Sequence, residues 1–141
     1  MKRILTIMAF MCIGFGVHAQ GSKDWTLMHS INGVEIYSKE VVCNPVGNDI
    51  QAEMIILKAV NKTGNTKTIS WQYEISYDGK CLTCNNEEYL ITFQLDGYKS
   101  ITGECHLEEG KPTLSIHKRY VNNIPNHQEF TGFSLSKLTV N

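Results

Sequence analysis

The strongest constraint on the fold is a run over residues 68–77 in which large side chains alternate with polar ones. The large side chains are Ile69, Trp71, Tyr73, Ile75 and Tyr77, and the polar ones are Thr68, Ser70, Gln72, Glu74 and Ser76. Successive side chains of a β-strand point to opposite faces, so the run predicts a half-buried strand. We expect Trp71 to lie in a core between two sheets and Gln72 to face solvent. An exposed aromatic ligand platform is the alternative to the core position.

Six further segments have the same period or a weaker form of it. They are Val34–Cys43, Ile50–Val60, Tyr89–Leu95, Ile101–Cys105, Leu114–Tyr120 and Phe133–Val140. The last segment changes phase across Ser136-Lys137, which predicts a β-bulge, and Asp96-Gly97 predicts a hairpin. Seven short strands without a helical period predict an all-β chain, a single antiparallel β-sandwich of immunoglobulin or fibronectin type. A small β-barrel is the alternative.

The segment at 50–60 is apolar in both phases, which predicts a central strand that is covered on both sides for part of its length. Its even-numbered side chains are the ones expected to face the core. Lys58 then interrupts that face, and Lys118 interrupts the inward face of the segment at 114–120 in the same way. Positions at an edge or an end, where the ammonium reaches solvent, would explain both lysines.

Residues 1–19 have the layout of a secretory signal peptide. The bases Lys2 and Arg3 precede an apolar stretch over 4–17, and Ala19 stands at the expected cleavage site before Gln20. A buried N-terminal helix or strand is the alternative. The signal predicts an exported domain of residues 20–141, periplasmic or extracellular, and the short basic start favours a bacterial source.

The charge of the exported part excludes some partners. The chain has 13 Lys+Arg and 14 Asp+Glu, and without Lys2 and Arg3 the balance is 11 − 14 = −3. A mildly acidic domain lacks the basic surface that nucleic-acid binding requires. No stretch after residue 20 approaches the roughly 18 apolar residues of a membrane-spanning helix. We therefore expect neither a nucleic-acid partner nor a membrane span.

Four cysteines remain after the predicted cleavage: Cys43, Cys81, Cys84 and Cys105. If consecutive strands run antiparallel, all four fall at one end of the sandwich. In an oxidising compartment, two structural disulfides are the favoured interpretation. Four cysteines permit three pairings, and the sequence does not decide among them. We slightly favour Cys43–Cys81 with Cys84–Cys105, because these bonds tie separate strands and close longer loops.

Two other roles for the cysteines stay open. A zinc site of four thiolates is one, although only one Cys-x-x-Cys half is present and exported thiolates tend to oxidise first. A redox pair at Cys81 and Cys84 is the other, although such pairs usually sit at a helix N-terminus, which lowers the thiol pKa. His106 could join such a site as a ligand or base, but an exposed loop position is the favoured explanation, because a neighbouring cysteine in a disulfide cannot be a nucleophile.

Several motifs occur together along nearly the whole exported part. They are Cys43-Asn44, the stretch from Trp71 through Asp78-Gly79-Lys80-Cys81-x-x-Cys84, Gly103-Glu104-Cys105 and Leu135-x-x-Leu138-Thr139-Val140. As a set they resemble small exported proteins of Bacteroidota with an immunoglobulin-like domain and no assigned function. The resemblance implies the fold and the compartment, and it carries over no catalytic or binding residue.

The sequence assigns no catalytic, cofactor-binding or metal-binding residue. It contains no Gly-x-Ser-x-Gly elbow, no His-Glu-x-x-His motif and no glycine-rich phosphate loop. The carboxylate pairs Glu87-Glu88 and Glu108-Glu109 are adjacent in sequence, whereas glycoside hydrolysis needs two facing carboxylates. We expect a non-enzymatic binding or accessory module of the cell envelope, without a cofactor, whose partner is an envelope protein or glycan. A metal-binding or thiol-redox module built on the cysteines is the alternative.

Overall fold

The computed structural model describes residues 24–44, 51–106, 108–121 and 128–141. The predicted signal peptide and its cleavage site lie outside these residues. The strands are β1 (Thr26–Ile31), β2 (Val34–Cys43), β3 (Ala52–Asn61), β4 (Lys67–Tyr77), β5 (Lys80–Cys81), β6 (Leu90–Leu95), β7 (Ser100–Thr102), β8 (Ser115–Tyr120) and β9 (Phe130–Val140). A 3₁₀ turn, η1 (Glu87–Tyr89), lies between β5 and β6. In the described part of the chain, no helix is long and apolar enough to cross a membrane.

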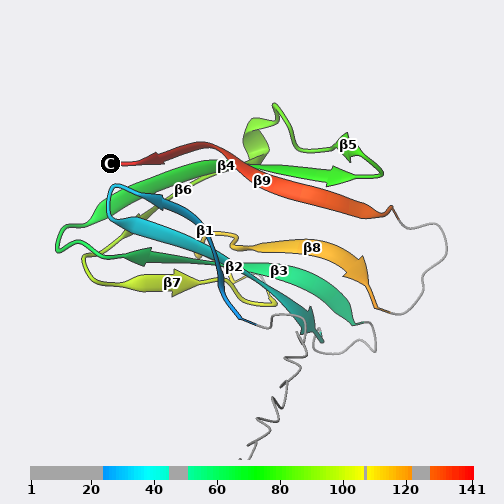
Figure 1. Ribbon diagram of the computed structural model, residues 1–141, viewed down its shortest axis with the longest axis horizontal. Coiled ribbons are helices and arrows are strands. Elements are labelled where there is room, and N and C mark those ends of the chain that lie inside the picture. Colours follow the sequence, from blue (N-terminus) through cyan, green and yellow to red (C-terminus); the bar gives the residue numbers. More distant parts are fainter. Residues whose placement is uncertain (1–23, 45–50, 107, 122–127) are drawn as a thin grey trace, which may run out of the picture.

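Two antiparallel sheets form two layers (Figure 1). Sheet A has the order β1-β2-β3, and the free edge of β3 pairs with β8 along residues 52–56 and with β7 along residues 58–60. In sheet B, β4 lies between β9 on one edge and β6 and β5 on the other. The all-β class and the antiparallel sheets predicted from the alternating pattern are confirmed.

The core lies between the inner faces of the two sheets. Its buried members are Val34, Ile36, Ile55, Leu57, Ala59, Ile69, Trp71, Tyr73, Leu95, Leu114, Ile116, Leu135 and Val140. Trp71 has no exposed surface, and its ring meets Tyr73 and Phe93 edge-on, with centroids 6.0 and 5.4 Å away. The expected core position of Trp71 is confirmed. The ligand-platform alternative is wrong, because the Trp71 and Tyr73 rings are buried.

The expected phase of β3 is wrong. Its core residues are Ile55, Leu57 and Ala59, so alternation puts the even-numbered side chains, Lys58 among them, on the outer face. Both faces of this strand are apolar, so its own pattern could not decide which one meets sheet B. The pairing with β2 does decide, because Ala59 lies opposite the buried Ile36.

Two tyrosine hydroxyls of β4 link the sheets. Tyr73 Oη donates to the carbonyl oxygen of Thr113 at 2.7 Å, and Tyr77 Oη donates to that of His117 in β8 at 2.5 Å. Burial raises the pKa of both tyrosines, so both remain protonated donors at neutral pH. The aromatic stripe of β4 therefore supplies specific polar contacts between the layers as well as apolar area.

Two Asx-Gly pairs form two-residue hairpin turns. Asn32 and Gly33 both have positive φ, 47° and 79°, and they join β1 to β2, with Ile31 opposite Val34. Asp78 and Gly79 do the same between β4 and β5, with φ of 49° and 72°. Positive φ at both central residues is the requirement of a type I′ turn. The two strands that these turns add, β1 and β5, were not predicted.

The hairpin expected at Asp96-Gly97 is wrong, because β6 belongs to sheet B and β7 to sheet A. The turn instead packs against the β3–β4 connection, where a Cβ on Gly97 would come within 2.3 Å of the Gly64 carbonyl oxygen. Asn61, 1% exposed, holds the two segments together. Its Nδ2 donates to the carbonyls of Asn65, Leu95 and Asp96 at 2.8, 3.0 and 3.1 Å.

The bulge expected in the last strand is confirmed. The β4–β9 register shifts between Ser70, opposite Thr139, and Gln72, opposite Ser136. Lys137, within the shift, has a φ of 50°. The extra residue restores the apolar phase, so that both Leu135 and Val140 reach the core.

Candidate functional site

The cysteines form two disulfides, and the expected pairing is wrong. Cys43 bonds to Cys105 and Cys81 bonds to Cys84, with Cα atoms 5.5 and 5.7 Å apart. The expectation favoured long loops for both bonds. The hairpin turn at 78–79 instead places Cys81 on β5, and the next three residues fold back to bring Cys84 within bonding distance.

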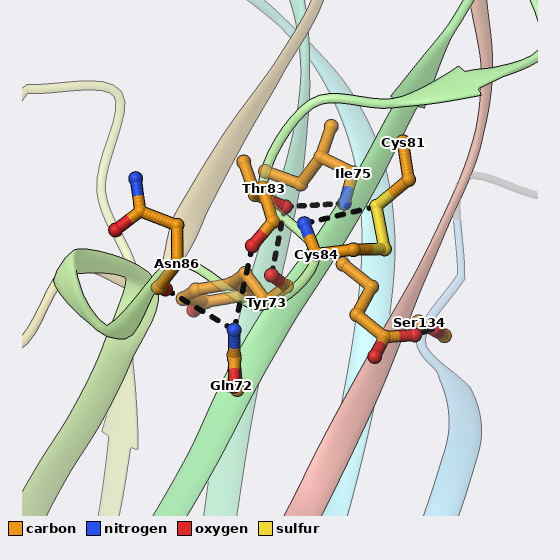
Figure 2. The surroundings of a disulfide bond; sticks show 9 residues. Gln72, Tyr73, Ile75, Cys81, Thr83, Cys84, Asn86 and Ser134 are labelled. Atoms are coloured by element: carbon orange, nitrogen blue, oxygen red, sulfur yellow. Dashed lines mark hydrogen bonds between the residues drawn. A yellow bond between two sulfur atoms is a disulfide. The ribbon is translucent and has the colours of Figure 1, made fainter.

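The two disulfides have different surroundings. Cys43 is 2% exposed at the end of β2, and it bonds across 62 positions of the chain to Cys105, which is exposed. Cys81 is exposed, Cys84 is half-buried, and the side chain of Leu82 between them is 51% exposed. The backbone N–H of Cys84 points at the Cys81 sulfur, with a nitrogen–sulfur distance of 3.1 Å (Figure 2). We call residues 81–86 the cysteine loop.

The cysteine loop is anchored to β4 by its own buried polar residue. The Thr83 hydroxyl, in a residue 4% exposed, donates to the Tyr73 carbonyl at 2.8 Å and accepts from the Ile75 N–H at 2.7 Å (Figure 2). The Leu82 N–H donates to the Ile75 carbonyl at 2.9 Å. On this edge of β4, β6 pairs only with residues 67–72 and β5 only with residues 76 and 77. The bonds from Thr83 and Leu82 satisfy backbone groups in the gap between these two strands.

Gln72 is buried rather than in solvent, so its expected position is wrong. It is 1% exposed, and its Nε2 donates to the carbonyl oxygens of Thr83 and Asn86 at 3.4 and 3.1 Å. Alternation does place it on the face opposite Trp71. The cysteine loop covers that position, which the strand pattern alone could not reveal.

The structure does not support the candidate metal site or the candidate carboxylate pairs. Among the described residues, which include Cys43, Cys81, Cys84 and Cys105, no group of three or more His, Cys, Asp or Glu side chains could hold a metal ion. His106 is exposed beside Cys105. Both carboxylate pairs, 87–88 and 108–109, are exposed, and Glu108 is 2.5 Å from the Lys111 ammonium.

Sheet A carries a group of lysines and aromatic rings on the face opposite the core. The Lys58 ammonium lies 4.4 Å from the centroid of the Trp25 ring and 5.0 Å from that of Tyr37. The Lys39 ammonium lies 5.8 Å from the Trp25 centroid. These are cation–π distances. We call Trp25, Tyr37, Lys39 and Lys58 the lysine–aromatic face, and the position of Lys58 there explains why a lysine interrupts an apolar strand.

The hydrogen bonds beside this face fix its electrostatics. The Tyr37 hydroxyl donates to Glu35 at 2.7 Å, and the Lys62 ammonium is 3.2 Å from the same carboxylate. The hydrogen bond from Tyr37 and then the contact with Lys62 lower the pKa of Glu35. Because the Tyr37 hydroxyl donates this bond, the protonated phenol is favoured and the pKa of Tyr37 is raised. Glu35 is thus engaged by its neighbours, while none of the ion pairs of the described residues includes Lys39 or Lys58.

A second charged group lies where β3 and β8 pair at one end of sheet A. Arg119 holds Glu53 through two bonds of 2.8 and 2.7 Å, and the Lys118 ammonium is 2.9 Å from Glu40. Hydrogen bonds from Arg119 lower the pKa of Glu53. An open cleft of about 590 Å³ adjoins these side chains. The two positive and two negative charges of these four side chains are paired with one another, and Lys39, which also lines the cleft and takes part in none of the ion pairs of the described residues, belongs to the lysine–aromatic face. This group is therefore a weaker binding candidate than that face.

Sequence reasoning missed the lysine–aromatic face. Trp25 stands just before β1, and without that strand nothing placed it next to Lys58. The available signal was Asn32-Gly33, which predicts a strand on each side of the turn.

No protein-family model, no curated protein and no solved structure matches the chain.

Proposed function

We propose that the protein is an exported, non-enzymatic binding module with an immunoglobulin-like sandwich. The pairings β3–β8 and β4–β9 support this classification, because immunoglobulin sandwiches pair their second strand with the fifth and their third with the sixth. Trp71 in β4 corresponds to the buried tryptophan of the third strand. Two disulfides support an oxidising compartment, and with it export.

The observation that carries the binding role is the Lys58 ammonium between the Trp25 and Tyr37 rings. Contact with two rings restricts the lysine side chain, so less conformational entropy is lost when a partner binds. Lys39 adds a second cation close by, and neither takes part in the ion pairs of the described residues. Restrained, uncompensated cations on the outer face of a sheet favour an anionic partner.

The ring geometry favours an acidic protein segment over a sugar. A sugar ring binds by stacking on an open aromatic face, but Lys58 already lies over both Trp25 and Tyr37. Carboxylates of a partner can pair with the lysines without displacing them from the rings. The partner we propose is therefore an acidic segment of another exported protein.

Binding of a Glu-rich peptide at low ionic strength tests the proposal. The double variant Lys39→Gln/Lys58→Gln should weaken binding by about tenfold, corresponding to about 1.4 kcal/mol. Lys137→Gln is the matched control, because Lys137 lies in β9 of sheet B, and it should leave the affinity unchanged. Equal affinities for the double variant and the wild type would contradict the role of this face. Preference for a sulfated polysaccharide over the peptide would favour a glycan partner instead.

A further inference from the structure

The two disulfides close loops of very different length. It closes a loop across only three positions of the chain, whereas Cys43–Cys105 spans 62. The entropy that a disulfide removes from the unfolded chain grows with the length of its loop. The short bond therefore adds much less to the stability of the fold than the long one.

The loop that holds this disulfide is fixed by other contacts. Thr83, between the two cysteines, has its hydroxyl bonded to backbone groups of Tyr73 and Ile75. Gln72 donates to the carbonyls of Thr83 and Asn86 from beneath the loop. None of these bonds involves a sulfur atom. Opening the disulfide leaves them in place, so the two thiols stay close enough to form the bond again.

The Cys81 sulfur accepts a hydrogen bond that would stabilise a negative charge on it. The Cys84 N–H is 3.1 Å from the Cys81 sulfur and points at it (Figure 2). A hydrogen bond to a thiolate stabilises the charged form, which is the role that a helix N-terminus performs in other Cys-x-x-Cys sites. Cys81 is also the exposed member of the pair, and Leu82 beside it offers a half-exposed apolar contact.

We propose that Cys81–Cys84 is a redox-active disulfide that accepts electrons from the dithiol of a partner protein, while Cys43–Cys105 stays oxidised. A thiolate of the partner attacks the Cys81 sulfur, the Cys81–Cys84 bond breaks, and its electron pair leaves on the Cys84 sulfur, which takes up a proton. The second thiolate of the partner then attacks the partner's first sulfur, which is bonded to Cys81 in the mixed disulfide. This step forms the partner's internal disulfide and releases Cys81 as a thiolate. Two electrons pass from the dithiol to the disulfide.

Selective reduction of the folded wild-type protein tests this assignment. The protein is treated with dithiothreitol at neutral pH, free thiols are alkylated with iodoacetamide, and the modified peptides are quantified by mass spectrometry. We expect Cys81 and Cys84 to be alkylated at least about 100-fold faster than Cys43 and Cys105, because attack on the exposed Cys105 sulfur would have to expel the buried Cys43 as a thiolate. Alkylation of all four cysteines at one rate, or of Cys81 and Cys84 only after unfolding, would overturn the proposal.

Two single variants test the roles of the sulfurs. Cys84→Ser leaves Cys81 as a free thiol and keeps the backbone N–H at position 84, whereas Cys81→Ser leaves only the half-buried Cys84. With oxidised glutathione at neutral pH, Cys84→Ser should form a mixed disulfide with glutathione at least about tenfold faster than Cys81→Ser does. A faster reaction of Cys81→Ser would refute Cys81 as the sulfur that carries the mixed disulfide. Near-UV circular dichroism of each variant verifies that the fold is retained.

Discussion

Both faces of β4 carry buried side chains, but different parts of the molecule bury them. On the inner face, Trp71 and Tyr73 are covered by the core side chains of both sheets. On the outer face, Gln72 is covered by the cysteine loop, a segment that follows β4 by only a few residues. One face is therefore buried by long-range packing and the other by local chain folding.

This difference determines which kind of residue each face can contain. The inner face meets apolar side chains, so burial itself supplies the favourable free energy. The outer face meets backbone carbonyls, so its buried residue must donate hydrogen bonds, and a glutamine amide does this. The comparison predicts large effects for apolar truncation inside, intermediate effects for polar truncation outside, and small effects for the disulfide over the outer face.

The largest effect is expected for Trp71→Ala. Truncating a fully buried tryptophan typically costs about 3–5 kcal/mol of unfolding free energy, because transfer and cavity terms add. Urea unfolding monitored by circular dichroism measures the loss. Trp71→Phe, which keeps an aromatic ring in contact with Tyr73 and Phe93, should lose less. A Trp71→Ala midpoint equal to that of the wild type would show that the inner face is not the core.

Gln72→Ala is expected to have the next largest effect, about 1–3 kcal/mol, because the carbonyls of Thr83 and Asn86 lose a donor in a buried site. Gln94→Ala is the matched control. Gln94 is exposed in β6 of the same sheet, so its truncation should change stability by no more than about 0.5 kcal/mol. If both variants unfold at the same denaturant concentration, the cysteine loop does not bury Gln72.

Gln72 also shows where sequence reasoning reached its limit. The alternating pattern correctly assigned Trp71 and Gln72 to opposite faces, because strand geometry alone fixes that relation. Solvent exposure of the polar face was an additional assumption. It failed because a segment without periodicity, the cysteine loop, covers one position of that face, and binary patterning does not report where loops lie.

The three Asx-Gly pairs show a similar limit. Asn32-Gly33 and Asp78-Gly79 adopt positive φ at both residues and form hairpins, as local propensity predicts. Asp96-Gly97 has the same chemistry, but the Asn61 amide and the close approach to Gly64 hold it in a turn between the sheets. Local sequence thus predicted the presence of a turn, whereas contacts from distant residues determined which strands it connects.

The candidate sites were partly predictable. The identity of the four cysteines follows from the sequence, but their pairing depends on how the chain returns after β5, which no pattern fixes. The lysine–aromatic face could not be assembled without β1, since Trp25 reaches Lys58 only through the β1–β2–β3 arrangement. Predicting a site that is built from neighbouring strands therefore requires the order in which the strands pair as well as their positions in the sequence.

A smaller effect on stability is expected from removing the outer disulfide. For a loop of about four residues, chain entropy accounts for at most about 2 kcal/mol, and the hydrogen bonds of Thr83 and Gln72 hold the native loop in place without the disulfide. Cys81→Ala/Cys84→Ala should therefore unfold cooperatively, at a denaturant concentration only slightly below that of the wild type. A loss as large as that of Trp71→Ala would mean that the disulfide, rather than Thr83 and Gln72, holds the outer face together.

The smallest effect is expected in the opposite sheet, at the charged end of β3, where Glu53 lies two residues before the buried Ile55. Bonds from Arg119 lower the pKa of Glu53 in the folded protein, so this carboxylate contributes stability above the ordinary glutamate pKa of about 4.3, and the contribution is lost as the pH falls below it. Glu53→Gln should consequently be slightly less stable than the wild type at pH 7, and the difference should vanish as the pH falls through the lowered pKa of Glu53. Urea midpoints measured across this range give the comparison, with Glu109→Gln as the exposed control that should show no such convergence. Because the Arg119 side chain is exposed, the difference should also shrink in high salt. A difference that persists unchanged at acid pH would assign the effect of the variant to packing in the inner face rather than to the charge of Glu53.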